Sequence, residues 1–169
     1  MSMDAPIALA RLIAELKAVA GRKRLQKIVH LLRASGSPDF RYRFILHYFG
    51  PYSRGLASDL DFLCAASIVK EVRFGDGSYR YSIDGKKGQK RIHDLTGGTA
   101  PEMKWAPLAK ELNEEAILLL EALSTIRFLA DRGHEGDELR DEFATAKPHL
   151  ADLFEKALKR GVKLELLSG

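Results

Sequence analysis

The break at Gly50-Pro51 constrains the fold of this chain more than any other feature of its sequence. Before the break, residues 40–49 (FRYRFILHYF) begin with alternating apolar and charged side chains, the pattern of a half-buried strand or extended segment. Proline has no N–H for a strand ladder and keeps the preceding residue out of the helical region. After it, Ser53 is a favourable helix N-cap, followed at helical spacing by Leu56, Leu60 and Leu63. The sequence predicts a strand that stops at Gly50-Pro51 and a helix that begins after Ser53.

The segments around this break predict a helical core with a β-hairpin. Residues 4–20 show an apolar helical stripe that Asp4 can cap and Gly21 can end, and residues 22–34 follow as a second helix. Residues 68–74 and 79–83 read as strands joined by a tight turn, and residues 84–91 as a polar, Gly-rich loop. This order is typical of a winged helix-turn-helix. We expect one core to contain Leu25, Ile28, Val29, Leu32, Leu56, Leu60 and Leu63.

The second half of the chain predicts a helical extension. Residues 95–108 (LTGGTAPEMKWAPL) are rich in Gly, Thr and Pro, which favours a boundary between domains 1–95 and 96–169. Residues 113–115 resemble a helix start, and residues 116–130 are apolar on more than one helical face. We therefore expect that helix to pack on the first domain as one globule, followed by two short helices split near Pro148. The predicted fold class is mainly α with a small β-hairpin (α+β).

Charge divides unevenly between the two halves. Residues 1–100 hold 17 Lys and Arg against 9 Asp and Glu, whereas residues 101–169 hold 10 against 14. A basic half is suited to a polyanion such as duplex DNA, although it is equally compatible with a solvated surface.

No apolar run approaches the roughly 20 residues that span a bilayer. Cys64 is the single cysteine and cannot form an internal disulfide. We expect a cytoplasmic protein that does not engage a membrane.

Basic residues gather on and after the predicted hairpin, interleaved with Tyr79 and Tyr81. Such a mixture of cations and aromatics is a candidate nucleic-acid surface, with an exposed hairpin of solvated charges as the alternative. The leading hypothesis is a non-enzymatic, winged-helix-like regulator that binds nucleic acid. Its predicted nucleic-acid-binding residues are Arg73, Arg80, Lys86, Lys87, Lys90 and Arg91.

A second hypothesis treats the chain as a protein-interaction module. The third predicted helix carries Asp59 and Asp61 but only one cation, Arg54, so it is poorly suited to read a major groove. Its acids could dock a basic partner surface or pair internally with residues 22–24. In the docking alternative, Tyr52, Arg54, Asp59 and Asp61 form the partner surface. The Gly50–Ser53 turn also has a sufficient local structural reason for each of its residues.

No catalytic constellation supports an enzyme. The five histidines are scattered, with no HExxH motif and no paired cysteines, so we expect no metal site. The Gly-rich stretches at residues 75–80 and 84–90 do not match a phosphate loop, and no nucleophile-elbow spacing supports a triad. We expect no cofactor.

Two long stretches also resemble a known family. These are residues 21–36 (GRKRLQKIVHLLRASG) and 42–69 (YRFILHYFGPYSRGLASDLDFLCAASIV), with a tail that includes Lys147-Pro148-His149. They resemble the YwgA-like family of uncharacterised bacterial proteins, except that Phe49 stands where the family pattern has Tyr. The Leu-Gln-Lys and Gly-Pro-Tyr-Ser elements are similar to the Panacea domain of SocA-like antitoxins. The resemblance implies a winged-helix domain and, through the Panacea relatives, a protein or toxin partner; it implies no catalytic residue.

Overall fold

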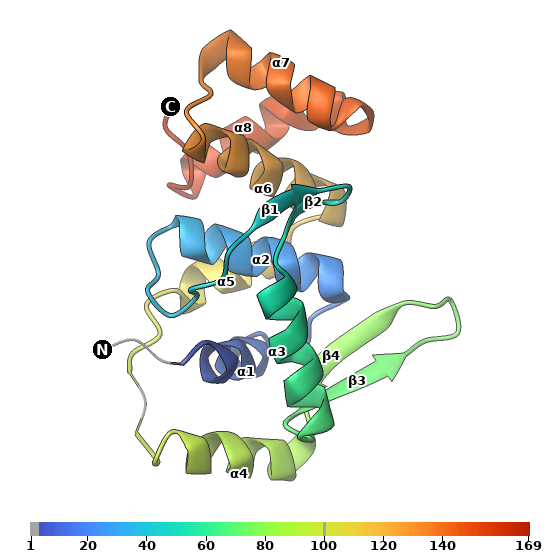
Figure 1. Cartoon of the computed structure of the whole chain (residues 1–169), viewed down its shortest axis with the longest axis vertical. Coiled ribbons are helices and arrows are strands. Elements are labelled where there is room, and N and C mark those ends of the chain that lie inside the picture. Colours follow the sequence, from blue (N-terminus) through green and yellow to red (C-terminus); the bar gives the residue numbers. More distant parts are fainter. Residues whose placement is uncertain (1–3, 100) are drawn as a thin grey trace.

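The computed structural model describes residues 4–99 and 101–169 and has an α+β architecture (Figure 1). Helices dominate it, and the described strands form two small antiparallel hairpins, β1–β2 and β3–β4. In chain order, the elements are α1 (Ala5–Leu16), α2 (Arg22–Ala34), β1 (Ile45–His47), β2 (Gly50–Tyr52), α3 (Arg54–Ala65), β3 (Val69–Arg73), β4 (Tyr79–Ile83), α4 (Gly85–Leu95), α5 (Ala106–Asn113), α6 (Ile117–Asp131), α7 (Gly136–Ala146), the 3-10 helix η1 (Pro148–Leu153) and α8 (Phe154–Lys163).

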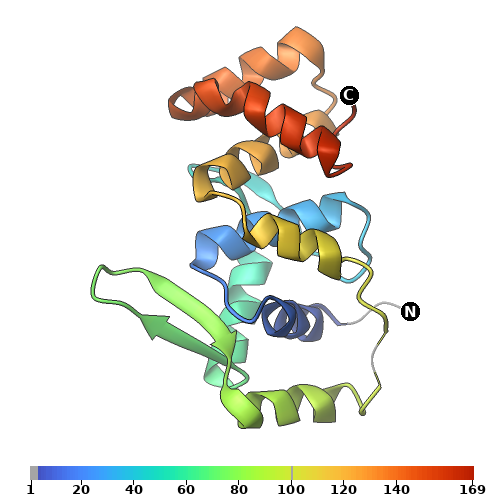
Figure 2. The same cartoon turned by 180° about the vertical axis from the view of Figure 1, so that it is seen from behind.

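Helix α2 lies at the centre of the molecule. It contacts α5, α6 and β2, while α1 packs against α3, α4 and α5. Figures 1 and 2 show α4 at one end, α7 and α8 at the other, and the β3–β4 hairpin projecting from the side of the helical body. The predicted core is confirmed, since all seven of its residues are buried in one cluster: Leu25, Ile28, Val29, Leu32, Leu56, Leu60 and Leu63.

Helix α6 packs against both halves of the chain. This agrees with the prediction from its apolar residues, which occupy more than one helical face. It contacts α2 on one side and α7 and α8 on another, and it buries Leu119, Leu123 and Leu129. The hydrophobic core therefore draws residues from both sides of the boundary predicted after residue 95. The division into domains 1–95 and 96–169 stays a prediction.

The prediction that the strand stops at Gly50-Pro51 was wrong, although the predicted alternation of apolar and charged side chains before it is correct. Phe40, Tyr42 and Phe44 are buried in turn, but Gly50 and Pro51 begin β2, which folds back on β1 with Leu46 opposite Pro51. Proline is compatible with this strand because a two-stranded sheet leaves one edge of each strand unpaired. Gly50 has φ +92°, and a Cβ there would lie 3.1 Å from Thr125 Oγ1, so both backbone conformation and packing require glycine.

Three further expectations about local structure need correction. Within the predicted loop at residues 84–91, residues 85–91 are the first part of α4. Of the predicted helix start at residues 113–115, Asn113 ends α5 and the two acids lie in the turn before α6. Helix α1 ends at Leu16, before Gly21, because Val19 leaves the helix to pair with Tyr81. Two expectations are confirmed: Ser53 Oγ accepts from the Leu56 N–H at 3.3 Å, and β3–β4 forms the predicted hairpin.

Candidate nucleic-acid interface

The β3–β4 hairpin is anchored at its base and free towards its turn. At the base, Val69 and Tyr81 are buried. The backbones of Val19 and Tyr81 exchange two N–H···O bonds, each of 2.9 Å, so the segment before α2 lies along the edge of β4. Beyond this point the hairpin leaves the body (Figure 1). We call residues 73–80 the hairpin tip.

Arg22, at the start of α2, holds the base of the hairpin to α3. Its guanidinium donates from Nη2 to Asp61 Oδ1 at 2.7 Å and to Glu71 Oε2 at 3.1 Å, and from Nε to the Tyr81 hydroxyl at 2.8 Å. Burial lowers the pKa of Arg22, but the hydrogen bonds with Asp61, Tyr81 and Glu71 outweigh it and raise the pKa above its ordinary value. One permanently charged side chain thus joins α2, α3 and β3–β4.

The two predicted cations on the hairpin lie at its tip, each beside an aromatic ring. The Arg73 guanidinium is 5.9 Å from the centre of the Tyr79 ring, and that of Arg80 is 5.2 Å from the Phe74 ring. In the register of the two strands, Arg73 lies opposite Tyr79 and Arg80 lies opposite Val72. Because neighbouring positions along a strand alternate between faces, the two arginine–aromatic pairs occupy opposite faces of the tip.

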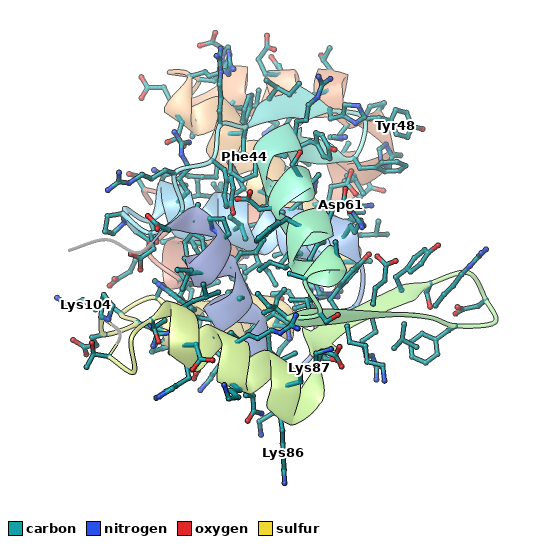
Figure 3. All side chains as sticks on the ribbon, turned by 60° about the horizontal axis from the view of Figure 1, so that its bottom comes forward. Phe44, Tyr48, Asp61, Lys86, Lys87 and Lys104 are labelled. Carbon is teal, nitrogen blue, oxygen red and sulfur yellow. The ribbon has the colours of Figure 1, made fainter. Side chains whose placement is uncertain are left out.

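The other four predicted cations belong to α4 and not to the hairpin. Lys86, Lys87 and Lys90 are exposed and Arg91 is half-buried. Figure 3 shows Lys86 pointing away from the body. Lys90 forms an ion pair of 2.9 Å with Asp94 one turn along the helix. Since α4 leaves the base of the hairpin in a different direction from the tip (Figures 1 and 2), the six predicted residues form two groups.

A cleft separates the hairpin tip from the start of α2. It has a volume of about 520 Å³, and its walls include Gly21, Lys23, Phe74, Tyr79 and Arg80. The Lys23 ammonium is already engaged, 2.5 Å from Glu121 Oε2. Arg22 also lines the cleft but is paired with Asp61 and Glu71, so Arg80 and the positive end of the α2 dipole supply the positive potential, opposed by Asp76 in the same wall.

The two acids proposed for a docking surface on α3 have internal partners. Asp61 pairs with Arg22, as the internal alternative predicted, and Asp59 accepts a hydrogen bond of 2.7 Å from the Tyr42 hydroxyl. Burial and this bond raise the pKa of Tyr42 above its ordinary value. Arg54 is exposed, and Tyr52 is half-buried with its ring 5.3 Å from that of His47. The assignment of these four residues to a partner surface stays a prediction.

A buried charged cluster beneath β1–β2 was not predicted. Its centre is the fully buried Glu121 of α6, with Lys147 Nζ 3.3 Å from Oε1. Lys147 also donates to the carbonyls of His47 and Tyr48, and Lys27 Nζ donates to the Pro51 carbonyl at 2.9 Å. Burial lowers the pKa of Lys27 to about 7; Glu121 opposes this effect. The two lysines fix the β1–β2 hairpin through its backbone carbonyls. Because both lysines are far from Glu121 in the sequence, no local pattern predicted this cluster.

The outer side of β1–β2 is apolar and exposed. Tyr48 is 74% exposed and meets the Phe49 ring edge-on, with ring centres 4.9 Å apart. Ile45 and Leu46 continue the same exposed stretch. Figure 3 shows Tyr48 directed away from the body. This surface, Ile45, Leu46, Tyr48 and Phe49, is called the aromatic hairpin below.

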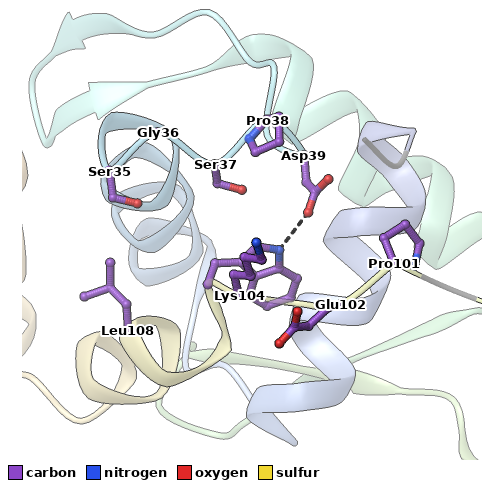
Figure 4. Close-up of a pocket in the computed structure, with 10 residues that line it drawn as sticks. Ser35, Gly36, Ser37, Pro38, Asp39, Pro101, Glu102, Lys104 and Leu108 are labelled. Atoms are coloured by element: carbon purple, nitrogen blue, oxygen red, sulfur yellow. Dashed lines mark hydrogen bonds between the residues drawn. The ribbon is translucent and has the colours of Figure 1, made fainter. Parts of the chain in front are cut away.

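A separate pocket lies between the loop after α2 and the segment before α5 (Figure 4). It has a volume of about 520 Å³, and Trp105 Nε1 donates to Asp39 Oδ2 at 2.9 Å in its wall. This bond joins the two segments, and the exposed residues Glu102 and Lys104 also line the pocket. Within residues 4–99 and 101–169, no group of three or more His, Cys, Asp or Glu side chains could hold a metal ion, and no helix has the length and apolar character to cross a membrane.

Comparison with known proteins places this chain beside one bacterial relative. It is 30% identical over 132 residues to the protein named "Uncharacterized protein YwgA" of Bacillus subtilis (strain 168). The aligned region covers 76% of this chain and 75% of the relative. No protein-family model matches the sequence. The extent of the alignment agrees with the resemblance carried by residues 21–36 and 42–69, and the chain belongs to the YwgA-like family.

Proposed function

We propose that the protein is a non-enzymatic, winged-helix-like regulator that binds nucleic acid through β3–β4 and α4. The observation that carries the proposal is the lack of carboxylate partners among the predicted cations. Of the six, only Lys90 forms an ion pair within the described residues, so the other five have no carboxylate that competes with phosphate. Unpaired cations on the hairpin tip and on α4 remain available to phosphates.

The local balance of charge supports the same proposal. Residues 69–95 contain seven Lys and Arg against four Asp and Glu. Two of these four carboxylates, Glu71 and Asp94, are already paired with Arg22 and Lys90. The segment therefore has a net positive charge, and a polyanion that approaches it releases counterions as phosphates are neutralised. The winged-helix hypothesis rests on the order helix, helix, extended segment, helix, hairpin, and the chain has α1, α2, β1–β2, α3 and β3–β4 in that sequence.

The test is fluorescence anisotropy with labelled duplex and single-stranded DNA at several salt concentrations. We expect the logarithm of the affinity to fall linearly with the logarithm of salt, by about 0.9 per phosphate contact on duplex DNA and about 0.7 on single strands. Changing Lys86 and Lys87 together to Ala should lower the affinity for all sequences alike. On duplex DNA, the slope should fall by about two if both residues contact phosphate.

Lys156→Ala with Lys159→Ala is the matched control. These exposed lysines lie on α8, at the opposite end of the molecule from α4 (Figure 1), so removing the same charge there should leave the slope unchanged. Equal effects of the two double variants would indicate a general charge effect and no interface at α4. Absence of affinity at low salt for both kinds of DNA, and for an RNA strand of the same length, would end the proposal.

The aromatic hairpin favours a second candidate function, that of a protein-interaction module with an antitoxin-like or adaptor-like role. Exposed aromatic side chains at the centre of a patch are typical anchors of protein interfaces. The likeness of the Leu-Gln-Lys and Gly-Pro-Tyr-Ser elements to the Panacea domain supports the same idea. In this case DNA binding would be negligible at physiological salt, and a double change of Tyr48 and Phe49 to Ser would abolish capture of a protein partner.

A further inference from the structure

We infer that the hairpin tip binds unpaired bases, so that the preferred ligand is a single-stranded nucleic acid. The inference rests on the proposed nucleic-acid function and refines it. The arginine–aromatic pairs, Arg73 with Tyr79 and Arg80 with Phe74, carry it together with the cleft beside them.

Helix α3 is not equipped to read a duplex. In a winged helix-turn-helix this position belongs to the helix that enters the major groove, where Arg, Lys, Asn and Gln read base edges. Here the exposed positions of α3 include Arg54, Asp61 and Phe62, and Asp61 is bound to Arg22. Phe62 is 57% exposed and offers no hydrogen bond to a base. Arg54 is therefore the one side chain of α3 of the types that usually read base edges, which is too few for specific readout of a duplex.

The hairpin tip, in contrast, has groups that match unpaired bases. Phe74 is 43% exposed and Tyr79 is 37% exposed, far more than structural aromatics such as Tyr81. Single strands are held by stacking of bases on aromatic rings and on arginine guanidinium planes. Because each ring has an arginine beside it, the tip provides an aromatic stacking surface with an adjacent cation on both of its faces.

The charges around the tip separate sites for bases from sites for phosphates. Asp76 in the turn accepts hydrogen bonds from the backbone N–H of Ser78 at 2.9 Å and from its hydroxyl at 2.6 Å. These bonds lower the pKa of Asp76, so the turn keeps a negative charge that repels phosphate. Phosphates are therefore expected towards Arg73 and Arg80 and at the start of α2, with bases on the rings between them.

The experiment compares three labelled probes of equal length by anisotropy: oligothymidylate, oligouridylate and a blunt duplex. We expect at least one of the two single strands to bind the wild-type protein at least about tenfold more tightly than the duplex, because stacking contributes only where bases are unpaired. Phe74→Leu removes the ring but keeps an apolar side chain. It should weaken single-strand binding about five- to a hundredfold and leave duplex binding unchanged, whereas Phe74→Trp should retain single-strand binding.

Phe62→Leu is the control, since Phe62 is an exposed phenylalanine outside the tip. Tighter binding of either single strand supports the inference, and the two probes distinguish DNA from RNA. Equal or tighter binding of the duplex would overturn the inference while leaving the proposed function intact. An equal loss with Phe62→Leu and Phe74→Leu would also overturn it. A protein that binds none of the three probes at low salt would instead refute nucleic-acid binding as a whole.

Discussion

At the scale of single residues, Lys27 makes a measurable prediction about stability and pH. Its folded-state pKa is lowered by burial from an ordinary 10.5 to about 7, so between these values the unfolded chain holds a proton that the folded chain lacks. Unfolding then takes up a proton, and the free energy of unfolding rises with pH in this window. We expect wild type to gain stability relative to Lys27→Met as pH rises from about 7 to about 10. Urea denaturation of both proteins across this range measures the difference.

Two further variants sharpen this measurement. Lys156→Met removes an exposed lysine of α8 and should show no such pH-dependent difference from wild type. Glu121→Gln removes the charge that supports the ammonium form of Lys27, so the pKa should fall further and the window should extend below pH 7. A difference between wild type and Lys27→Met that stays constant across the range would show that Lys27 keeps its ordinary pKa in the folded protein.

At the scale of elements, α4 depends on a glycine in its interior. A Cβ on Gly88 would lie 2.5 Å from the Ile68 carbonyl oxygen and 2.8 Å from Ile83 Cγ2. The backbone of α4 therefore packs directly against the base of the hairpin, with no room for a side chain between them. Gly88→Ala improves helix propensity by about 1 kcal/mol, but the clash is with a backbone oxygen that cannot move aside alone, so the overpacking cost lies at the upper end of about 1–3 kcal/mol. We expect net destabilisation in chemical denaturation.

Gln89→Ala serves as the control for this change. Gln89 is the exposed neighbour of Gly88 on α4, so the substitution should change stability by less than about 0.5 kcal/mol. Equal stabilities of Gly88→Ala and wild type would mean that α4 does not pack closely on Ile68.

The sequence was informative about elements wherever one local signal dominated. Apolar spacing identified α2, α3 and α6, and the turn at residues 75–78 identified β3–β4. Helix α4 was missed because the glycines at its start and interior read as a loop, whereas contact with Ile68 requires the glycine at position 88. Strand β2 was missed because proline argues against a strand, and only a free sheet edge makes Pro51 acceptable.

The candidate site was predictable only in part. The cations of residues 73–91 were identified from their clustering in the chain, but their division between the hairpin tip and α4 depends on how the hairpin leaves the body. Lys27 is a charged residue of a type that normally lies on the surface, yet it is buried. Its burial depends on Glu121 and on the Pro51 carbonyl, which only the tertiary fold brings to α2.

At the scale of the whole molecule, we expect unfolding in one cooperative step. The core contains Leu9 of α1, Leu32 of α2, Leu123 of α6 and Phe154 of α8 in one cluster, and α6 contacts both α2 and α8. Calorimetry should show a single thermal transition with equal calorimetric and van't Hoff enthalpies. A fragment of residues 1–98 loses the packing of α6 and should lack the native circular dichroism spectrum. Two well-separated transitions, or a stable native-like fragment, would contradict this prediction.

The anchoring of the β3–β4 hairpin by Arg22 also gives the molecule an electrostatic direction. At the base, one guanidinium faces two carboxylates, Asp61 and Glu71, so this cluster has a surplus of one negative charge. Towards the tip, Arg73 and Arg80 outnumber Asp76, and the sign reverses. The hairpin is thus a polarised arm, positive at its free end and negative at its attachment. Near a polyanion, such an arm experiences a torque that turns its positive outer end towards the polyanion. The molecule is therefore oriented before any contact forms.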